Sequence, residues 1–454
     1  MLSHFNFLLF LFIISVFPIF TKFKSKTITK SKPILLPPGP APWPLPTFRW
    51  IHGFMKEMNT EIACIQLGNI HVIPVTSQEI SREFLKKHDA VFASRPITMA
   101  TEYSSGGFLT TAMRRVLASD MINPSTFRLL HDNRVEEADN IVRCIYNQCK
   151  ISTSNNCLGS VINLRNTVRQ YSGNAIRKMI LNTRYFGQGK KDGGPGAALL
   201  DLDGHEKTVR EAMNTINKYH DPIVDQRVEQ LRNGEKEAED LLDFLISVKD
   251  SNGEPLLSVA EIKAQCTELM LAGVYSPSNA IEWALAEMIN QPEVLSKAVE
   301  EIDSVVGKER LVQESDFQQL NHVKACIREA LRLHPIALFN LPHASNSDAT
   351  VAGYFIPKGS HVLLSRLGLG RNPRIWEGPL NFNPERHLSA STVQAVELNE
   401  PNLRFISFRT GRRGCAGTAF GSAIAVMLLA MLLRGFTWSP PPGQEEIDLS
   451  RVKK

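Results

Sequence analysis

The ten residues FRTGRRGCAG at positions 408–417 are the most informative stretch of this 454-residue chain. Glycines at 411, 414 and 417 allow the backbone to fold tightly and to approach another group closely. An apolar, helix-forming run follows Cys415, and a helix N-terminus with cationic neighbours favours the thiolate form of cysteine. The chain lacks a CxxC or histidine-rich partner set for zinc. The thiolate is therefore predicted to act as a single metal ligand or as a nucleophile.

The order of residues around this cysteine points to one kind of metal group. A lone cysteine thiolate holds haem iron in oxygen-activating enzymes. The pattern Phe408-x-x-Gly411-x-Arg413-x-Cys415-x-Gly417 resembles the haem-binding signature of cytochromes P450. The alternative is a chance Gly/Arg loop around a buried cysteine, which requires five residues of the right types to fall in order by accident. The resemblance implies haem b, with Cys415 as the iron ligand and the other four residues around the cofactor.

Two more motifs precede the loop in the order that this family requires. Glu329 and Arg332 lie three residues apart, a spacing that places both on one face of a helix. The run NPER at 383–386 resembles the family's meander motif. By resemblance, Glu329, Arg332 and Arg386 form a structural cluster behind the haem. His343 resembles the residue that contacts a haem propionate.

A closer resemblance covers nearly the whole chain after residue 37. The runs similar to plant amino-acid N-monooxygenases are WIH at 50–52, DLDGHE at 201–206, PSNAIEW at 277–283, RLHP at 332–335, NLPH at 340–343 and TGRRGC at 410–415. These enzymes hydroxylate the nitrogen of an α-amino acid twice and yield an aldoxime, which feeds plant defence metabolism. The resemblance implies the same activity, with dioxygen and an amino acid as substrates and electrons from NADPH–cytochrome P450 reductase. Arg404, Arg409 and Arg412 would attract that reductase, or they form an ordinary solvated surface.

The segment expected to activate oxygen departs from the subfamily pattern. The subfamily carries an aspartate in a run like TVDNPSN, whereas this chain has AGVYSPSN at 272–279. Tyr275 replaces the acid, and a phenol with an ordinary pKa of roughly 10 is a poor substitute in proton delivery. Ser276 supplies a hydroxyl near the expected alcohol. Pro277 lacks an N–H and should open the helix, either to host a relay water or only to kink it. The residues expected beside the haem are Ala272 and Gly273.

Several family segments are missing from the chain. After Thr111 the tryptophan that pairs with a propionate is absent, so only Arg114 is expected to make that contact. A second gap near 194–200 removes a helix over the substrate pocket. A third gap, at the carboxyl end, removes the terminal strand pair. A smaller gap is expected after Pro46. Mis-joined exons and a decaying gene copy explain these gaps equally well. The alternatives are therefore a degenerate, non-catalytic chain, or a haem-thiolate enzyme that does not activate dioxygen.

The amino terminus predicts a membrane anchor. Residues 1–21 carry no charged side chain, and as a helix they would span about 31 Å, close to a hydrocarbon core of roughly 30 Å. Lysines follow this run, which favours a retained anchor with a cytosolic catalytic domain over a cleaved signal peptide. Prolines between 37 and 46 form a stiff spacer or a plain linker. The expected organisation is an anchor and basic flank at 1–26, a Pro-rich linker at 27–47 and a truncated haem-thiolate domain at 48–454, in the endoplasmic reticulum membrane.

Composition agrees with one globular body. Apolar residues make up 43% and charged residues 21%, which excludes a disordered chain, and a net charge of +5 does not indicate nucleic acid. The other six cysteines are expected to pack as small apolar residues. The run at 416–434 reads as a buried core helix in preference to a membrane span. The patterns predict a mainly α fold with a minor β portion, with helices at 174–181, 206–230 (broken at Pro222), 237–248, 258–290, 292–306 and 316–333, and strands at 62–67, 72–75, 349–355 and 361–364.

Overall fold

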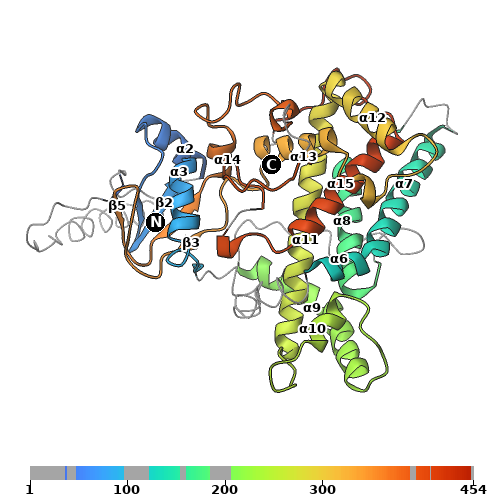
Figure 1. Ribbon diagram of the computed structural model, residues 1–454, viewed down its shortest axis with the longest axis horizontal. Helices are drawn as coiled ribbons and strands as arrows, with labels where there is room; N and C mark the ends of the chain where they lie inside the picture. The colour runs from blue at the N-terminus through green and yellow to red at the C-terminus, as the bar shows by residue number, and fades with distance from the viewer. Residues whose placement is uncertain are drawn as a thin grey trace, which may run out of the picture.

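The computed structural model describes residues 36–37, 48–96, 122–153, 160–184, 206–388, 395–408 and 411–450. The expected anchor at 1–26, almost all of the linker, and Arg114 lie outside these residues. Figure 1 shows a smaller part with the strands on one side and a larger part built of helices on the other. The chain before the last helix, drawn in red, reaches from the helical part toward the strands.

The smaller part is built around a four-stranded sheet in the order β1-β2-β6-β3. β2 and β6 pair in parallel, with Val72 opposite His361, although they come from opposite ends of the chain. The elements of this part are α2 (Phe48–Glu57), β1 (Ile65–Leu67), β2 (Ile70–Val75), α3 (Gln78–Arg82), β3 (His343–Ala344), β4 (Ala349–Val351), β5 (Tyr354–Ile356), β6 (His361–Leu364) and α14 (Arg366–Gly370). A π-helical turn at Glu83–Lys87 follows α3.

The larger part is helical. Its elements are α6 (Pro124–Leu129), α7 (His131–Thr153), α8 (Leu164–Leu181), α9 (Glu206–Arg232), α10 (Leu241–Ser247), α11 (Val259–Ile289), α12 (Pro292–Val306), α13 (Asn321–Leu333) and α15 (Thr418–Gly435), with short 3-10 turns η4 (Glu314–Asp316), η5 (Pro384–His387) and η6 (Gly411–Arg413). α11 begins where a capping box formed by Ser258 and Glu261 satisfies its first amides. α12 begins with Pro292 and ends at Gly307, whose φ is 76°.

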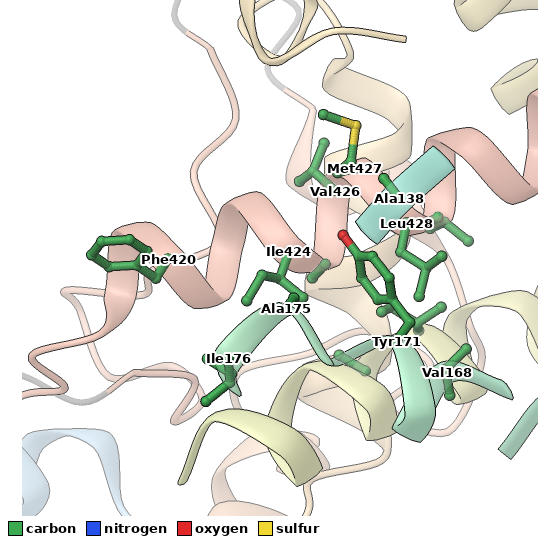
Figure 2. Packing of buried hydrophobic residues seen from close by; sticks show 14 of the residues in the cluster. Ala138, Val168, Tyr171, Ala175, Ile176, Phe420, Ile424, Val426, Met427 and Leu428 are labelled. Atoms are coloured by element: carbon green, nitrogen blue, oxygen red, sulfur yellow. The ribbon is translucent and has the colours of Figure 1, made fainter. Parts of the chain in front are cut away.

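α15 lies in the middle of the helical core. Its residues from Ala423 to Leu433 are all buried. Figure 2 shows Ile424 beside Ala175, and Leu428 beside Tyr171, across the junction with α8. Within the described residues, α15 is also the one helix long and apolar enough to cross a membrane, yet 67% of it is buried in the protein. The prediction of a core helix is therefore confirmed.

Most predicted elements are present, with differences in their limits. β6 occupies the predicted residues, and the predicted strand at 349–355 is a hairpin that turns at Ala352 and Gly353, where φ is 51° and 81°. α8 begins ten residues before the predicted start at Asn174. The predicted break at Pro222 is wrong, because α9 continues through this residue. Proline removes one helical hydrogen bond, and the buried Val224 and Val228 hold the next turns of α9 against the core.

Candidate active site

The Cys415 loop is a tight hairpin that presents its sulfur outward. The Cys415 amide donates to the Phe408 carbonyl at 2.7 Å, and the Gly414 amide donates to the Gly411 carbonyl at 2.9 Å. Thr418 Oγ1 donates to the Cys415 carbonyl at 2.9 Å and joins the loop to α15. These bonds fix the backbone on both sides of the cysteine and leave the thiol exposed.

The other described cysteines lie in different surroundings. Cys64, Cys266 and Cys326 are buried, as expected for small apolar residues, and Cys144 is exposed on α7. Burial raises the pKa of the Cys266 thiol to about 12 and also raises the pKa of Cys326. Buried thiols with raised pKa values are poor thiolate ligands. Cys415 is thus set apart by exposure and by its position before a helix.

The structure gives a geometric reason for one of the signature glycines, Gly411. Gly411 has a φ of 75°, and a Cβ there would lie 2.6 Å from the Leu85 carbonyl oxygen. A Cβ on Gly417 would lie 4.0 Å from the Cys415 sulfur. The turn therefore requires Gly411, whereas position 417 has room for a Cβ. Phe408 packs beside Gly421 of α15, where an added Cβ would meet its ring at 3.5 Å.

Arg413, expected beside the cofactor, and His343, expected at a propionate, both bind the backbone at 92–93. Arg413 Nε donates to the Ala93 carbonyl at 2.6 Å. His343 Nδ1 donates to the neighbouring Phe92 carbonyl at 2.7 Å, because a carbonyl can only accept. His343 is buried, with Asn340 Nδ2 3.3 Å from its Nε2. Two side chains 70 residues apart in sequence thus donate hydrogen bonds to consecutive carbonyls next to the cysteine loop.

The predicted oxygen-site residues of α11 lie on different sides of this helix. Ala272 and Ser276 are exposed, and so is Glu268 one turn earlier. Residues four apart differ by only about 40° around a helix, so these three form one exposed stripe. Ser278 lies about 200° from Ser276 and donates to the Val168 carbonyl of α8 at 3.1 Å. Ser276 therefore lies on the side of α11 opposite to Ser278.

Gly273 and Tyr275 contact α8 instead. A Cβ on Gly273 would lie 2.4 Å from Cδ1 of Ile176. The Tyr275 ring lies under the Arg169 guanidinium, 5.2 Å from its centre. α11 is continuous across Pro277, which leaves the Gly273 carbonyl without its usual helical donor. The structure thus brings Ala272 and Ser276 together, and it gives Gly273 and Tyr275 contacts with the neighbouring helix.

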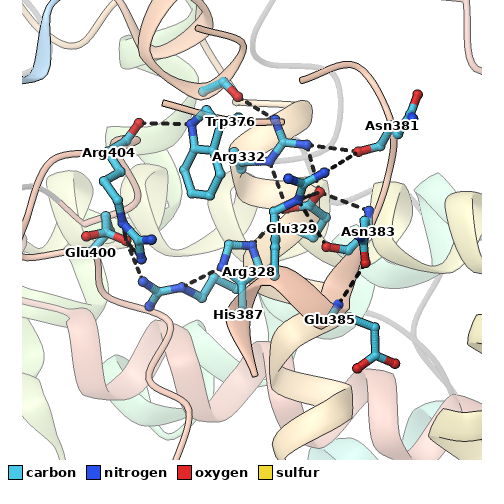
Figure 3. Close-up of polar contacts among 12 residues, drawn as sticks. Arg328, Glu329, Arg332, Trp376, Asn381, Asn383, Glu385, His387, Glu400 and Arg404 are labelled. Carbon is cyan, nitrogen blue, oxygen red and sulfur yellow. Dashed lines mark hydrogen bonds and ion pairs between the residues drawn. The ribbon is translucent and has the colours of Figure 1, made fainter. Parts of the chain in front are cut away.

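Glu329, Arg332 and Arg386 form the predicted cluster. Figure 3 shows Arg332 beside Glu329. Arg332 makes two bonds of 2.7 Å to the Glu329 carboxylate, and both side chains are fully buried. Arg386 Nε donates to Glu329 at 3.0 Å. Burial alone would raise the pKa of Glu329, but hydrogen bonds from Arg332 and His387 hold it at about 2. His387 was not predicted as a member, because its sequence neighbours do not reveal which buried carboxylate it meets.

The basic residues of the predicted reductase surface are partly paired. Arg404 contacts Glu400 at 2.9 Å and stacks over Trp376. Arg412 pairs with Asp89 at 3.1 Å and is 68% exposed. Exposed ion pairs contribute little to stability, so Arg412 stays available to an approaching anionic surface.

The donor set fits haem better than an ion held by side chains alone. Among the described residues, no group of three His, Cys, Asp or Glu side chains could hold a metal ion. The groups near the loop suit a flat iron cofactor with one protein ligand. They are the exposed sulfur of Cys415, the guanidinium of Arg413, which can bind a carboxylate, and the exposed stripe of α11 with the small residue Ala272.

Comparisons with known proteins agree with this geometry. The sequence profile of the cytochrome P450 family matches residues 195–452. A tryptophan N-monooxygenase of Prunus mume is 54% identical, over 96% of this chain and 91% of the relative. The chain belongs to the cytochrome P450 family. A phenylalanine N-monooxygenase of Arabidopsis thaliana is 52% identical, over 95% of this P450 and 91% of the relative. A tyrosine N-monooxygenase of Sorghum bicolor is 50% identical, over 92% of this P450 and 83% of the relative.

The solved structures show the same fold. A zebra fish cytochrome P450 solved with progesterone aligns with a TM-score of 0.72 over 87% of this P450 and 93% of that chain, at 20% identity. The expectations of a P450 fold and of a P450 enzyme are confirmed. The alignment with the Prunus mume relative extends over 487 positions, more than the 454 residues of this P450. Part of the relative therefore has no counterpart here, as the predicted gaps require.

Proposed function

We propose that this P450 is a haem-thiolate monooxygenase that hydroxylates the nitrogen of an α-amino acid and forms an aldoxime in plant defence metabolism. The intact Cys415 loop, with its sulfur exposed before α15, carries the proposal. Relatives named for tryptophan, phenylalanine and tyrosine N-monooxygenation support the substrate class, since each is at least 50% identical. Their substrates differ at similar identity, so individual pocket side chains select the amino acid.

Haem b held by Cys415 would supply the reductive activation of dioxygen. One oxygen atom goes to the substrate nitrogen and the other leaves as water, with two electrons from NADPH through the reductase. Two such hydroxylations, followed by loss of carbon dioxide and water, convert an α-amino acid to an aldoxime.

The described side chains would take distinct parts in this reaction. Arg413 supplies a cation for a propionate, next to the carbonyl of Ala93 that it now contacts. Ala272 gives clearance on the exposed stripe of α11. Ser276 offers a hydroxyl that can hold a water and pass a proton. Glu268, one turn from Ala272 on this stripe, would orient the substrate ammonium group.

The membrane setting belongs to the same proposal. Residues 1–26 would anchor the chain in the endoplasmic reticulum membrane, residues 27–47 would form the spacer, and residues 48–454 would form the cytosolic haem domain. NADPH–cytochrome P450 reductase would approach the side of Arg404 and Arg412.

The direct test is turnover by the full chain with a plant reductase and NADPH. Each of the common amino acids is supplied in turn, and products are identified by mass spectrometry. We expect one amino acid, or a few of similar shape, to give an NADPH-dependent aldoxime that is absent with Cys415→Ser. A haem-loaded, reducible protein that forms no N-hydroxylated product from any amino acid would contradict the proposal.

One observation favours a second candidate, a haem-thiolate enzyme that does not activate dioxygen. Tyr275 stands where the subfamily has its acid, and it lies under Arg169 of α8. A site without that proton donor suits the rearrangement of a hydroperoxide or the dehydration of an oxime. Turnover of such a substrate without reductase and NADPH would support this candidate, and NADPH-dependent aldoxime formation would exclude it as the main activity.

A further inference from the structure

His387 joins two charged networks beside α13 (Figure 3). Its side chain is fully buried at the end of η5. His387 Nε2 lies 2.8 Å from the Glu329 carboxylate, which also binds Arg332 and Arg386. On its other side, Arg328 Nε donates to His387 Nδ1 at 3.3 Å. Within the described residues, the side-chain hydrogen bonds between the two networks pass through this imidazole.

The network beyond Arg328 holds the stretch that leads to the cysteine loop. Arg328 donates to the carbonyl of Glu397, to the carbonyl of Asn399 at 2.5 Å, and to the carboxylate of Glu400 at 2.5 Å. Glu400 in turn holds Arg404. Phe405, which packs beside Arg328, is buried. Since Phe408 follows three residues later and accepts the Cys415 amide, the position of Arg328 bears on the geometry of the thiolate loop.

The partners of His387 require a neutral ring. The Arg328 guanidinium can only donate, so Nδ1 must present its lone pair. The Glu329 carboxylate can only accept, so Nε2 carries the proton. A second proton on Nδ1 would point at Arg328, with the cation of Arg404 nearby. Burial lowers the pKa of His387 in spite of the Glu329 carboxylate, in agreement with this arrangement.

We propose that His387 is a positioning residue for the Cys415 loop, because its neutral ring fixes Arg328 and thereby the stretch 397–405. Protonation of His387 would push Arg328 away and loosen this stretch. The charged groups that face the ring are Glu329, Arg328 and Arg332 from α13, Arg386 from η5, and Glu400 and Arg404 from the following stretch. The inference rests on haem ligation by Cys415, and it does not depend on which amino acid is hydroxylated.

The test compares His387→Phe and His387→Asn in the full-chain haem protein. Phenylalanine fills the space but accepts no hydrogen bond, whereas the asparagine oxygen can replace Nδ1 as the acceptor for Arg328 and does not titrate. The measured quantity is the ratio of thiolate-ligated to thiol-ligated haem, read from the carbon monoxide difference spectrum between about pH 7 and about pH 5. His322→Asn, a change at another buried histidine of α13, is the matched control.

We expect the parent protein and the His322→Asn control to lose the thiolate form on acidification. His387→Phe should have a ratio lower by roughly fivefold at neutral pH, the equivalent of one hydrogen bond. His387→Asn should keep a near-parental ratio at neutral pH with a flattened pH profile, and it provides the test if the phenylalanine variant does not fold. A parental pH profile in His387→Asn would overturn the proposal. Loss of amino-acid turnover with unchanged haem ligation would concern the proposed function alone.

Discussion

At the scale of single residues, the structure separates two side chains that are adjacent in sequence. Ser276 is exposed on the stripe of α11, whereas Tyr275 lies under Arg169. Proton delivery should therefore depend on Ser276. We expect Ser276→Ala to lower the product formed per NADPH by roughly a hundredfold, at the lower end of the range for proton-transfer groups. Tyr275→Phe keeps the ring under Arg169 and should leave this ratio within about twofold. NADPH consumption and product formation are measured in the same assay. A larger loss of product per NADPH in Tyr275→Phe than in Ser276→Ala would show that Tyr275 is the proton donor.

Glu268 gives a prediction about substrate binding. Its carboxylate lies on the exposed stripe, where it can accept from the substrate ammonium group. We expect Glu268→Gln to weaken amino-acid binding by about tenfold, the equivalent of a charge-assisted hydrogen bond. Glu282→Gln is the matched control, because Glu282 is on the same helix and pairs with Arg165. Dissociation constants come from the substrate-induced change in the haem spectrum. Equal binding by both variants would remove Glu268 from the site.

At the scale of elements, the contact between α8 and α11 positions the exposed stripe. Gly273 has no room for a Cβ because Ile176 of α8 lies 2.4 Å from that position. We expect Gly273→Ala to reduce the free energy of unfolding by about 1–3 kcal/mol, as overpacking does. In the Ile176→Ala background, Gly273→Ala should reduce the free energy of unfolding much less. Urea unfolding of the double variant and of Ile176→Ala alone gives this difference. If Gly273→Ala lowers the haem content but not the free energy of unfolding, and Ile176→Ala does not restore the haem content, then Gly273 lies at the cofactor instead.

Sequence patterns predicted some elements well and others poorly for physical reasons. α12 and β6 have local signals, Pro292 at a helix start and a short run of β-branched and apolar residues, and both were found at the predicted positions. The first half of α8 has polar and charged residues on an exposed side, so its apolar pattern begins late. α9 runs through Pro222 because packing by later turns outweighs one lost hydrogen bond.

The same limit applies to the site. The Cys415 loop, Glu329, Arg332 and Arg386 were predicted because their order along the chain resembles a known family. His387 and Arg328 were missed, since their partners lie up to about 70 residues away and only the fold brings them together. The contacts of Gly273 with Ile176 and of Tyr275 with Arg169 were not predicted, because sequence order alone does not show which side of α11 faces α8.

At the scale of the whole molecule, acid should weaken the fold through buried groups. Burial, with Arg177 nearby, lowers the pKa of His220 to about 4 from an ordinary 6.5. The unfolded chain then binds the proton more readily, so this stability is present above about pH 6.5 and is lost as the pH falls to about 4. Glu329, with a folded pKa of about 2, adds a loss that begins below about pH 4.5.

The free energy of unfolding should therefore fall by about 3 kcal/mol from His220 alone between about pH 6.5 and about pH 4. His220→Gln should flatten that portion of the profile and leave the loss below about pH 4, to which Glu329 contributes, unchanged. Urea unfolding of the full chain across this pH range provides the measurement, with His71→Gln on β2 as the control. A slope equal to that of the parent protein in His220→Gln would show that other groups cause the acid sensitivity.

Every proposed activity requires Cys415 to hold haem in a chain that lacks segments of its relatives. The carbon monoxide difference spectrum of the reduced, full-length protein tests this most directly, beside Cys415→Ser and a Cys144→Ser control on α7. We expect a Soret band at the thiolate-ligated position for the parent protein and for Cys144→Ser, and its loss in Cys415→Ser. A parent protein that takes up no haem, or a thiolate band that persists in Cys415→Ser, would contradict this expectation.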